Sequence, residues 1–131
     1  MIQRDFILRE IQQLVQWLGI LIGLRQRGEH NLALQKISQA FDKLPVDETG
    51  GLPTEKLNAL LDEGVYDLET LEFTANLYVE KGLNLLELEQ ENKAYANFEQ
   101  AKIMYQLLKI RKVALNWTSY DNMSYLNKLL S

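Results

Sequence analysis

The same spacing of small and large apolar residues occurs twice in this 131-residue chain. Ala94, Phe98 and Ala101 lie at steps of four and three, and residues 33–40 repeat those steps as alanine, isoleucine and alanine. Such steps place the three side chains of each set on one face of a helix. Because alanine lets a second helix approach closely, the pattern predicts two pairs of tightly packed helices.

Helical periodicity covers most of the chain, and no segment shows the alternation of apolar and polar residues that is typical of a strand. Gly28, Pro45 and Gly64 are predicted to end helices, and Asn31 and Asp67 to cap them. A loop is predicted at residues 46–52, a polar turn at 90–93, and a capping pair at residues 118 and 121. The predicted helices cover residues 2–27, 31–44, 54–63, 67–89, 94–112 and 118–130. We therefore predict an all-α fold with one domain over residues 1–131.

Composition narrows the classes of function. Hydrophobic residues make up 47 % of the chain and charged residues 24 %, which is typical of a globular protein. The net charge of −4 argues against a nucleic-acid partner, and the absence of cysteine excludes disulfides and fits a reducing compartment. The basic clusters, at residues 25–27 and 109–112, fall at predicted helix ends, where cations complement the helix dipole.

A membrane segment and a secretory signal are not expected. The apolar run at residues 17–24 is shorter than the roughly 20 residues that a spanning helix needs. Gly19 and Gly23 within it are interpreted as admitting a close neighbour in a buried helix. The mixed charges of the first ten residues are unlike a signal peptide. We therefore expect a soluble, cytoplasmic protein.

No combination of residues indicates catalysis, a cofactor or a metal. His30 is the only histidine, and it lies in a predicted turn where a solvated side chain is expected. A zinc site lacks further histidine or cysteine ligands, and the acidic residues around Gly64 lack the alternating ligands of a calcium loop. The loop at residues 46–52 lacks the lysine of a phosphate-binding loop and the serine of a nucleophile elbow. We expect no enzymatic activity.

The two spaced sets resemble the tetratricopeptide repeat, in which a bulky aromatic residue and small residues mark the contact of two antiparallel helices. The first copy supplies Trp17, Gly28, Ala33, Ala40 and Pro45, and the second supplies Tyr78, Gly82, Ala94, Phe98 and Ala101. Leu21 and Gln106 stand where the repeat usually has glycine and proline, and the copies lie 61 residues apart instead of about 34. The resemblance covers about half of the chain. It implies two antiparallel hairpins, a short intervening helix and a C-terminal helix.

The opening residues MIQRDFILREI are also similar to the start of an uncharacterised bacterial family of short helical proteins. The similarity covers these residues and, more loosely, the length and helical layout. It implies a bacterial protein and no particular activity.

In tetratricopeptide proteins the first helix of each hairpin lines a groove that often holds a peptide. The corresponding positions are Val15, Leu18, Ile22, Arg25 and Gln26 in the first copy and Asn76, Val79, Leu83, Leu86 and Glu87 in the second. An open groove this apolar marks an interaction site. The short helix, the final helix with Tyr125 and Leu129, a second copy of the chain or a partner helix are the candidates that cover it.

We therefore expect a non-catalytic protein-interaction or scaffolding module that uses the groove between its hairpins. The expected partner is a protein or peptide, with a homodimer as one form, and neither nucleic acid, membrane nor metal is expected. The alternative is a helical bundle that binds a small apolar ligand between its hairpins.

Overall fold

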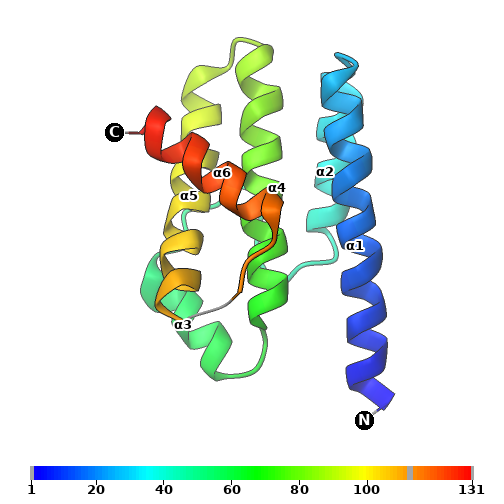
Figure 1. Ribbon diagram of the computed structural model, residues 1–131, viewed down its shortest axis with the longest axis vertical. Coiled ribbons are helices and arrows are strands. Elements are labelled where there is room, and N and C mark those ends of the chain that lie inside the picture. Colours follow the sequence, from blue (N-terminus) through cyan, green and yellow to red (C-terminus); the bar gives the residue numbers. More distant parts are fainter. Residues whose placement is uncertain (1, 112–113, 131) are drawn as a thin grey trace.

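The computed structural model describes the backbone of residues 2–111 and 114–130, and the side chains of residues 12, 13, 15–111 and 114–130. Every regular element in these residues is a helix (Figure 1). In chain order the helices are α1 (Ile2–Gln26), α2 (His30–Phe41), α3 (Thr54–Asp62), α4 (Leu68–Glu87), α5 (Glu91–Ile110) and α6 (Trp117–Leu129). The predicted all-α fold is confirmed.

Several predicted helix ends are confirmed. Gly28 and Gly64 follow α1 and α3 with φ angles of 78° and 75°, a left-handed conformation that glycine adopts without strain. The side chain of Asp67 caps α4 by accepting a hydrogen bond from the backbone N–H of Thr70 at 2.7 Å. Residues 46–52 contain no helix, as predicted.

Other predicted ends are wrong for local reasons. α2 ends at Phe41 instead of residue 44, because the N–H groups of Lys43 and Leu44 reach back only three residues. Residues 91–93, predicted as a turn, form the first turn of α5, where polar side chains are compatible with a helix. Asn116, not Thr118, caps α6, and its side chain accepts from the N–H of Ser119 at 2.9 Å.

The helices form two adjacent pairs with α4 at the centre (Figure 1). α1 and α2 run in opposite directions, as do α4 and α5, and α6 crosses α4 and α5 obliquely. α4 has its most extensive contact with α5 and also packs against α1, α2 and α6, whereas α3 packs against α5. α4 thus contacts both α1 and α2, and α6 contacts both α4 and α5.

The two spaced sets lie at the centre of these contacts. Ala33, Ile37, Ala40, Ala94, Phe98 and Ala101 are all fully buried. The prediction that these faces carry helix contacts is confirmed. The largest buried side chains around them include Tyr78, Leu21 and Met104. One core therefore connects the first helix pair to the second.

The glycines of α1 do not receive a neighbouring helix, contrary to prediction. A Cβ atom placed on Gly19 would meet nothing within 4 Å, and one on Gly23 would meet only the side chain of Arg27 from the same helix. Leu18, Leu21 and Leu24 provide the buried face of this segment instead. None of the described helices combines the length and hydropathy that crossing a membrane requires.

Candidate functional site

Four polar side chains follow one face of the central helix α4. Glu72, Asn76, Glu80 and Asn84 are spaced four residues apart, and their exposed fractions are 8 %, 1 %, 3 % and 0 %. We call them the polar stripe. Steps of four place side chains on the same side of a helix, one above the other. Buried polar groups are costly without hydrogen-bonding partners, so the neighbours of the stripe decide what it does.

The C-terminal half of the polar stripe, Glu80 and Asn84, contacts polar side chains of α1 and α2. The guanidinium of Arg25 on α1 donates from Nε to Oε2 of Glu80 at 2.8 Å and from Nη2 to Oε1 at 3.0 Å. This paired hydrogen bond to Glu80 raises the pKa of Arg25 above its ordinary value. Nδ1 of His30 lies 2.9 Å from Oδ1 of Asn84. His30, predicted to be a solvated turn residue, therefore begins α2 with its side chain against α4.

Asn76 joins the stripe to α5 and α6. Its Oδ1 accepts hydrogen bonds from the hydroxyl of Tyr105 and, at 3.1 Å, from Nδ2 of Asn122. Its Nδ2 donates to Oγ of Ser119 at 3.1 Å. Burial raises the pKa of the Tyr105 phenol. The side-chain amide of Asn76 is therefore occupied by partners on two other helices.

Glu72 differs from the other three residues because only one of its two carboxylate oxygens accepts a hydrogen bond from the described residues. Oε2 accepts from the backbone N–H of Asn116 at 2.8 Å and from Oγ–H of Ser119 at 2.6 Å. Among the described residues, Oε1 accepts no hydrogen bond and no lysine or arginine forms an ion pair with Glu72. Within the same residues, no fully buried side-chain nitrogen or oxygen lacks a partner. Oε1 therefore remains accessible.

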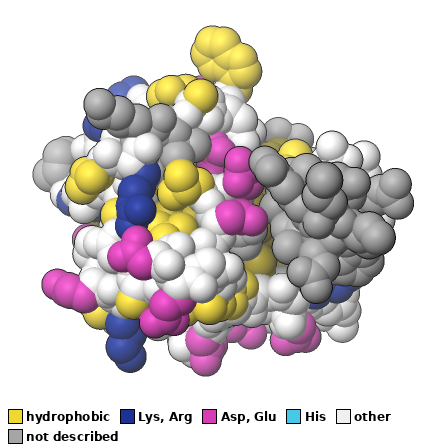
Figure 2. Space-filling model, turned by 90° about the horizontal axis from the view of Figure 1, so that it is seen from below, with side chains coloured by type: hydrophobic (Ala, Val, Ile, Leu, Met, Phe, Trp, Pro, Cys, Tyr) yellow, Lys and Arg dark blue, Asp and Glu magenta, His cyan; other side chains and the backbone are white. Residues whose placement is uncertain are grey.

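A cavity of about 180 Å³ lies beside Glu72, between α1, α4 and the residue before α6. We call it the α1–α4 cavity. Its described lining residues are Val15, Leu18, Glu69, Glu72, Phe73, Asn76 and Asn116. The lining thus combines apolar side chains from α1 and α4 with two glutamates from the first two turns of α4. Figure 2 views the end of the molecule at which α4 begins, and several acidic side chains lie on it.

The positions predicted for a groove are distributed over several environments. Val15, Leu18 and Asn76 line the α1–α4 cavity, and Arg25 is paired with Glu80. Val79 is fully buried in the core, and Ile22 and Leu83 are partly buried against it. Gln26 and Glu87 are exposed. Of the predicted set, three residues therefore share one cavity, and most of the others contact helices of the same chain.

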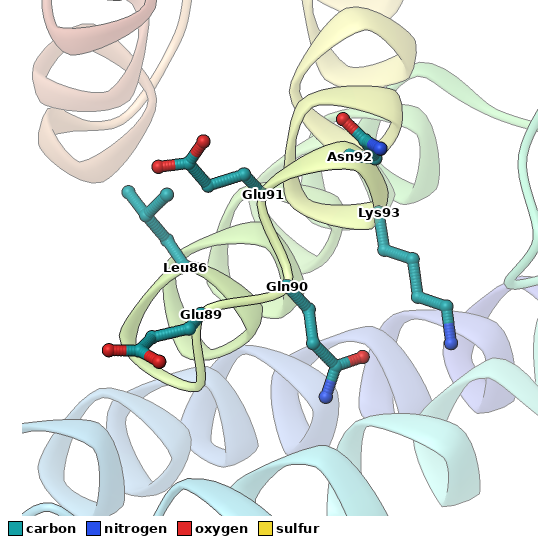
Figure 3. Close-up of a pocket in the computed structure, with 6 residues that line it drawn as sticks. All are labelled: Leu86, Glu89, Gln90, Glu91, Asn92 and Lys93. Atoms are coloured by element: carbon teal, nitrogen blue, oxygen red, sulfur yellow. The ribbon is translucent and has the colours of Figure 1, made fainter.

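Leu86 lines a separate hollow of about 750 Å³ at the turn between α4 and α5 (Figure 3). All of its described lining residues come from this turn and the ends that it joins. Figure 3 shows Glu89 and Glu91 pointing to one side while Gln90 and Lys93 point to the other. Because these polar groups do not converge, the hollow is a weaker candidate than the α1–α4 cavity.

A third hollow of about 420 Å³ lies between α2, α4 and α5, with Leu34, Leu85 and Ala96 among its lining residues. Its cation Lys81 is already bound: Nζ donates to the backbone oxygen of Glu48 at 3.0 Å and lies 3.4 Å from its carboxylate. Among the described residues, no group of three acidic or histidine side chains is placed to hold a metal ion.

Of the polar stripe, sequence reasoning identified Asn76 alone, although the four-residue spacing of all four side chains was the available signal. The hydrogen-bonding partners of the stripe could not be predicted from spacing, because they depend on where α1 and α6 pack. Comparison of the chain with protein-family models, curated proteins and solved structures finds no match.

Proposed function

We propose that this chain is a non-catalytic protein-interaction module whose α1–α4 cavity receives a side chain from a partner protein. The observation that carries the proposal is the carboxylate of Glu72, which is buried at the cavity wall with Oε1 lacking a partner among the described residues. An accessible carboxylate oxygen beside apolar walls can accept a charge-assisted hydrogen bond from a partner. A partner that donates to Oε1 gains this hydrogen bond on binding, together with the apolar contacts of the cavity.

The proposal includes two tetratricopeptide-like hairpins, α1 with α2 and α4 with α5. Opposite helix directions within each pair and fully buried alanines at the contacts support it. Further support comes from packing: α4 contacts both helices of the first pair, and α6 both helices of the second, as in a stack of helical repeats. Such stacks bind partners along an extended face, and α1 and α4 would form that face here.

The matched test uses two exposed positions on α1. Val15 is 49 % exposed and lines the cavity, whereas Ile20 is 54 % exposed and lines none of the described cavities. Random peptides displayed on phage are selected on the parent and then measured against Val15→Trp and Ile20→Trp. We expect binding to survive in Ile20→Trp and to weaken about tenfold or more in Val15→Trp, because the indole fills the cavity mouth. Failure to select peptides, or equal binding by both variants, would contradict the proposal.

A second copy of the chain is one partner that the proposal allows. Light scattering after size-exclusion chromatography gives the mass of the parent in solution. A dimer that Val15→Trp converts to a folded monomer would place self-association at the cavity. A parent monomer would direct the search to other proteins.

The hollow between α2, α4 and α5 favours a second candidate function, the binding of a small apolar ligand. Its volume of about 420 Å³ lies within the range of ligand pockets, and Leu34, Leu85 and Ala96 give it apolar walls. Native mass spectrometry of freshly purified protein tests this candidate. Additional mass that disappears on denaturation would support it, and the bare chain mass would count against it.

A further inference from the structure

We propose that the side chain received by the α1–α4 cavity is cationic, the lysine or arginine of a partner segment. This inference rests on the proposed function and names the chemistry of its partner. It follows from three properties of the cavity: which hydrogen-bonding groups remain unused, how its charge is compensated, and what size and polarity of group it admits.

The unused charged groups of the cavity are carboxylate oxygens, which accept hydrogen bonds. The amide of Asn76 is occupied by Tyr105 and Ser119, and Oδ1 of Asn116 caps α6. Oε1 of Glu72 has no hydrogen bond among the described residues, and Glu69, one turn earlier on α4, is exposed. Glu69 and Glu72 are three residues apart, so their side chains lie on adjacent parts of the helix surface. A donor is therefore needed to complete the hydrogen bonding of Glu72.

The described part of the chain does not neutralise these carboxylates. Arg25, the cation bound to the polar stripe, forms both of its hydrogen bonds with Glu80, which lies two turns further along α4. The start of α6 donates one backbone N–H to Glu72, and a helix N-terminus is equivalent to only about half a positive charge. Net negative charge therefore remains on the described part of the cavity wall, and it favours a cationic donor over a neutral one.

The size and the apolar walls fit one long side chain. About 180 Å³ is small compared with ordinary ligand pockets of roughly 300–1,000 Å³. Val15, Leu18 and Phe73 line this space together with the carboxylates. Lysine and arginine place a methylene stem against apolar surface and a charged head group at its end. The apolar lining of the cavity suits the methylene stem, and its carboxylates suit the charged head group.

The test uses single amino-acid probes, so that it does not depend on a selected peptide. Acetylated methylamides of arginine and lysine are titrated into isotope-labelled protein, with those of citrulline and norleucine as neutral counterparts. We expect at least one cationic probe to give saturable shifts of the Asn116 and Ser119 amide resonances. Its affinity should exceed that of its neutral counterpart about tenfold, because a charge-assisted hydrogen bond is lost in the latter.

Two variants assign the effect to Glu72. Glu72→Gln retains an oxygen that accepts from Asn116 and Ser119, and it should remove the preference for the cation. Glu87→Gln changes an exposed carboxylate on the same helix away from the cavity and should leave the preference unchanged. Val15→Trp is the second loss-of-binding variant if Glu72→Gln does not fold. Cationic and neutral probes that bind equally, or shifts that persist in Glu72→Gln, would overturn the inference.

Peptide selection and the titration of amino-acid probes can contradict the two proposals independently. Selected peptides that depend on Val15 but contain no essential lysine or arginine would leave the proposed function standing and overturn the cationic partner. Cationic probes that bind at Glu72 while no peptide is selected would support the cation site and contradict the peptide-binding function.

Discussion

Gly82 of α4 lies directly against the ring of Phe98 of α5. A Cβ atom built on Gly82 would stand 2.4 Å from Cε1 of that ring and 2.7 Å from Cδ1. The ring also contacts Tyr95 and Tyr125, with centroids 5.9 Å and 6.0 Å away. The ring is therefore held between three neighbours, and it occupies the space that a side chain at position 82 would need.

Gly82→Ala should lower the free energy of unfolding by about 1–3 kcal/mol, because the new methyl group overpacks the Phe98 ring. This value is the net loss, after the roughly 1 kcal/mol that alanine gains over glycine in a helix, because the methyl group would meet three ring atoms within 3 Å. Gly19→Ala on α1 is the control, since its Cβ would meet nothing within 4 Å, and it should be stabilising. Urea unfolding measures both. A Gly82→Ala variant as stable as the parent would contradict the close contact.

Glu89→Gly should stabilise the turn between α4 and α5. Glu89 has a φ angle of 61°, and the N–H groups of Glu89 and Gln90 return to the carbonyl oxygens of Leu86 and Leu85. This closes α4 in a conformation that costs other residues about 1 kcal/mol and glycine little. We expect a gain of about 0.5–1 kcal/mol in thermal or urea unfolding. Asn92→Gly, inside the first turn of α5, should instead be destabilising, and equal effects would refute the explanation.

The ion pair between Arg25 and Glu80 should matter more than the exposed pair near it. Arg25→Met leaves the Glu80 carboxylate, whose side chain is 4 % exposed, without its cation, and should cost about 3 kcal/mol. Arg27→Met removes an exposed pair with Glu29 and should change stability by less than about 0.5 kcal/mol. The double variant Arg25→Met with Glu80→Leu should lose less than Arg25→Met alone. A larger loss in the double variant would count against an uncompensated charge as the cause.

Spacing along the chain was sufficient to predict the helices and the buried faces of two of them. Steps of four and three placed Ala94, Phe98 and Ala101 on one face, and all three are fully buried. Gly64 and Asp67 marked helix ends because their preferences act within a few residues. Local signals of this kind do not depend on the rest of the fold.

The candidate site depends on packing that local signals do not specify. Asn116 and Ser119 reach Glu72 only because α6 begins beside the first turns of α4, and no local preference fixes that position. Transfer of groove positions from the resemblance also grouped Val79 with Val15 and Leu18, whereas Val79 is fully buried in the core and does not line the α1–α4 cavity. The sequence therefore predicted which faces of the helices are buried more reliably than which residues line a cavity.

Three buried tyrosines should make the protein sensitive to alkaline pH. Burial raises the pKa of Tyr66, Tyr78 and Tyr105 above the ordinary value of 10.0. Above that pH the unfolded chain loses these protons and the folded chain retains them. The folded chain then binds more protons, so the free energy of unfolding falls as pH rises. Each tyrosine contributes a decrease of about 1.4 kcal/mol per pH unit until its folded form ionises.

Urea unfolding followed from neutral pH to above pH 10.0 tests this dependence. Tyr105→Phe loses the hydroxyl that donates to Asn76, so it should be less stable than the parent at neutral pH. It should nevertheless lose stability less steeply above pH 10.0, because one titrating group has been removed. Tyr66→Phe, which loses a hydrogen bond to Thr74, should behave in the same way. If neither substitution reduces the slope, the alkaline sensitivity does not arise from these buried phenols.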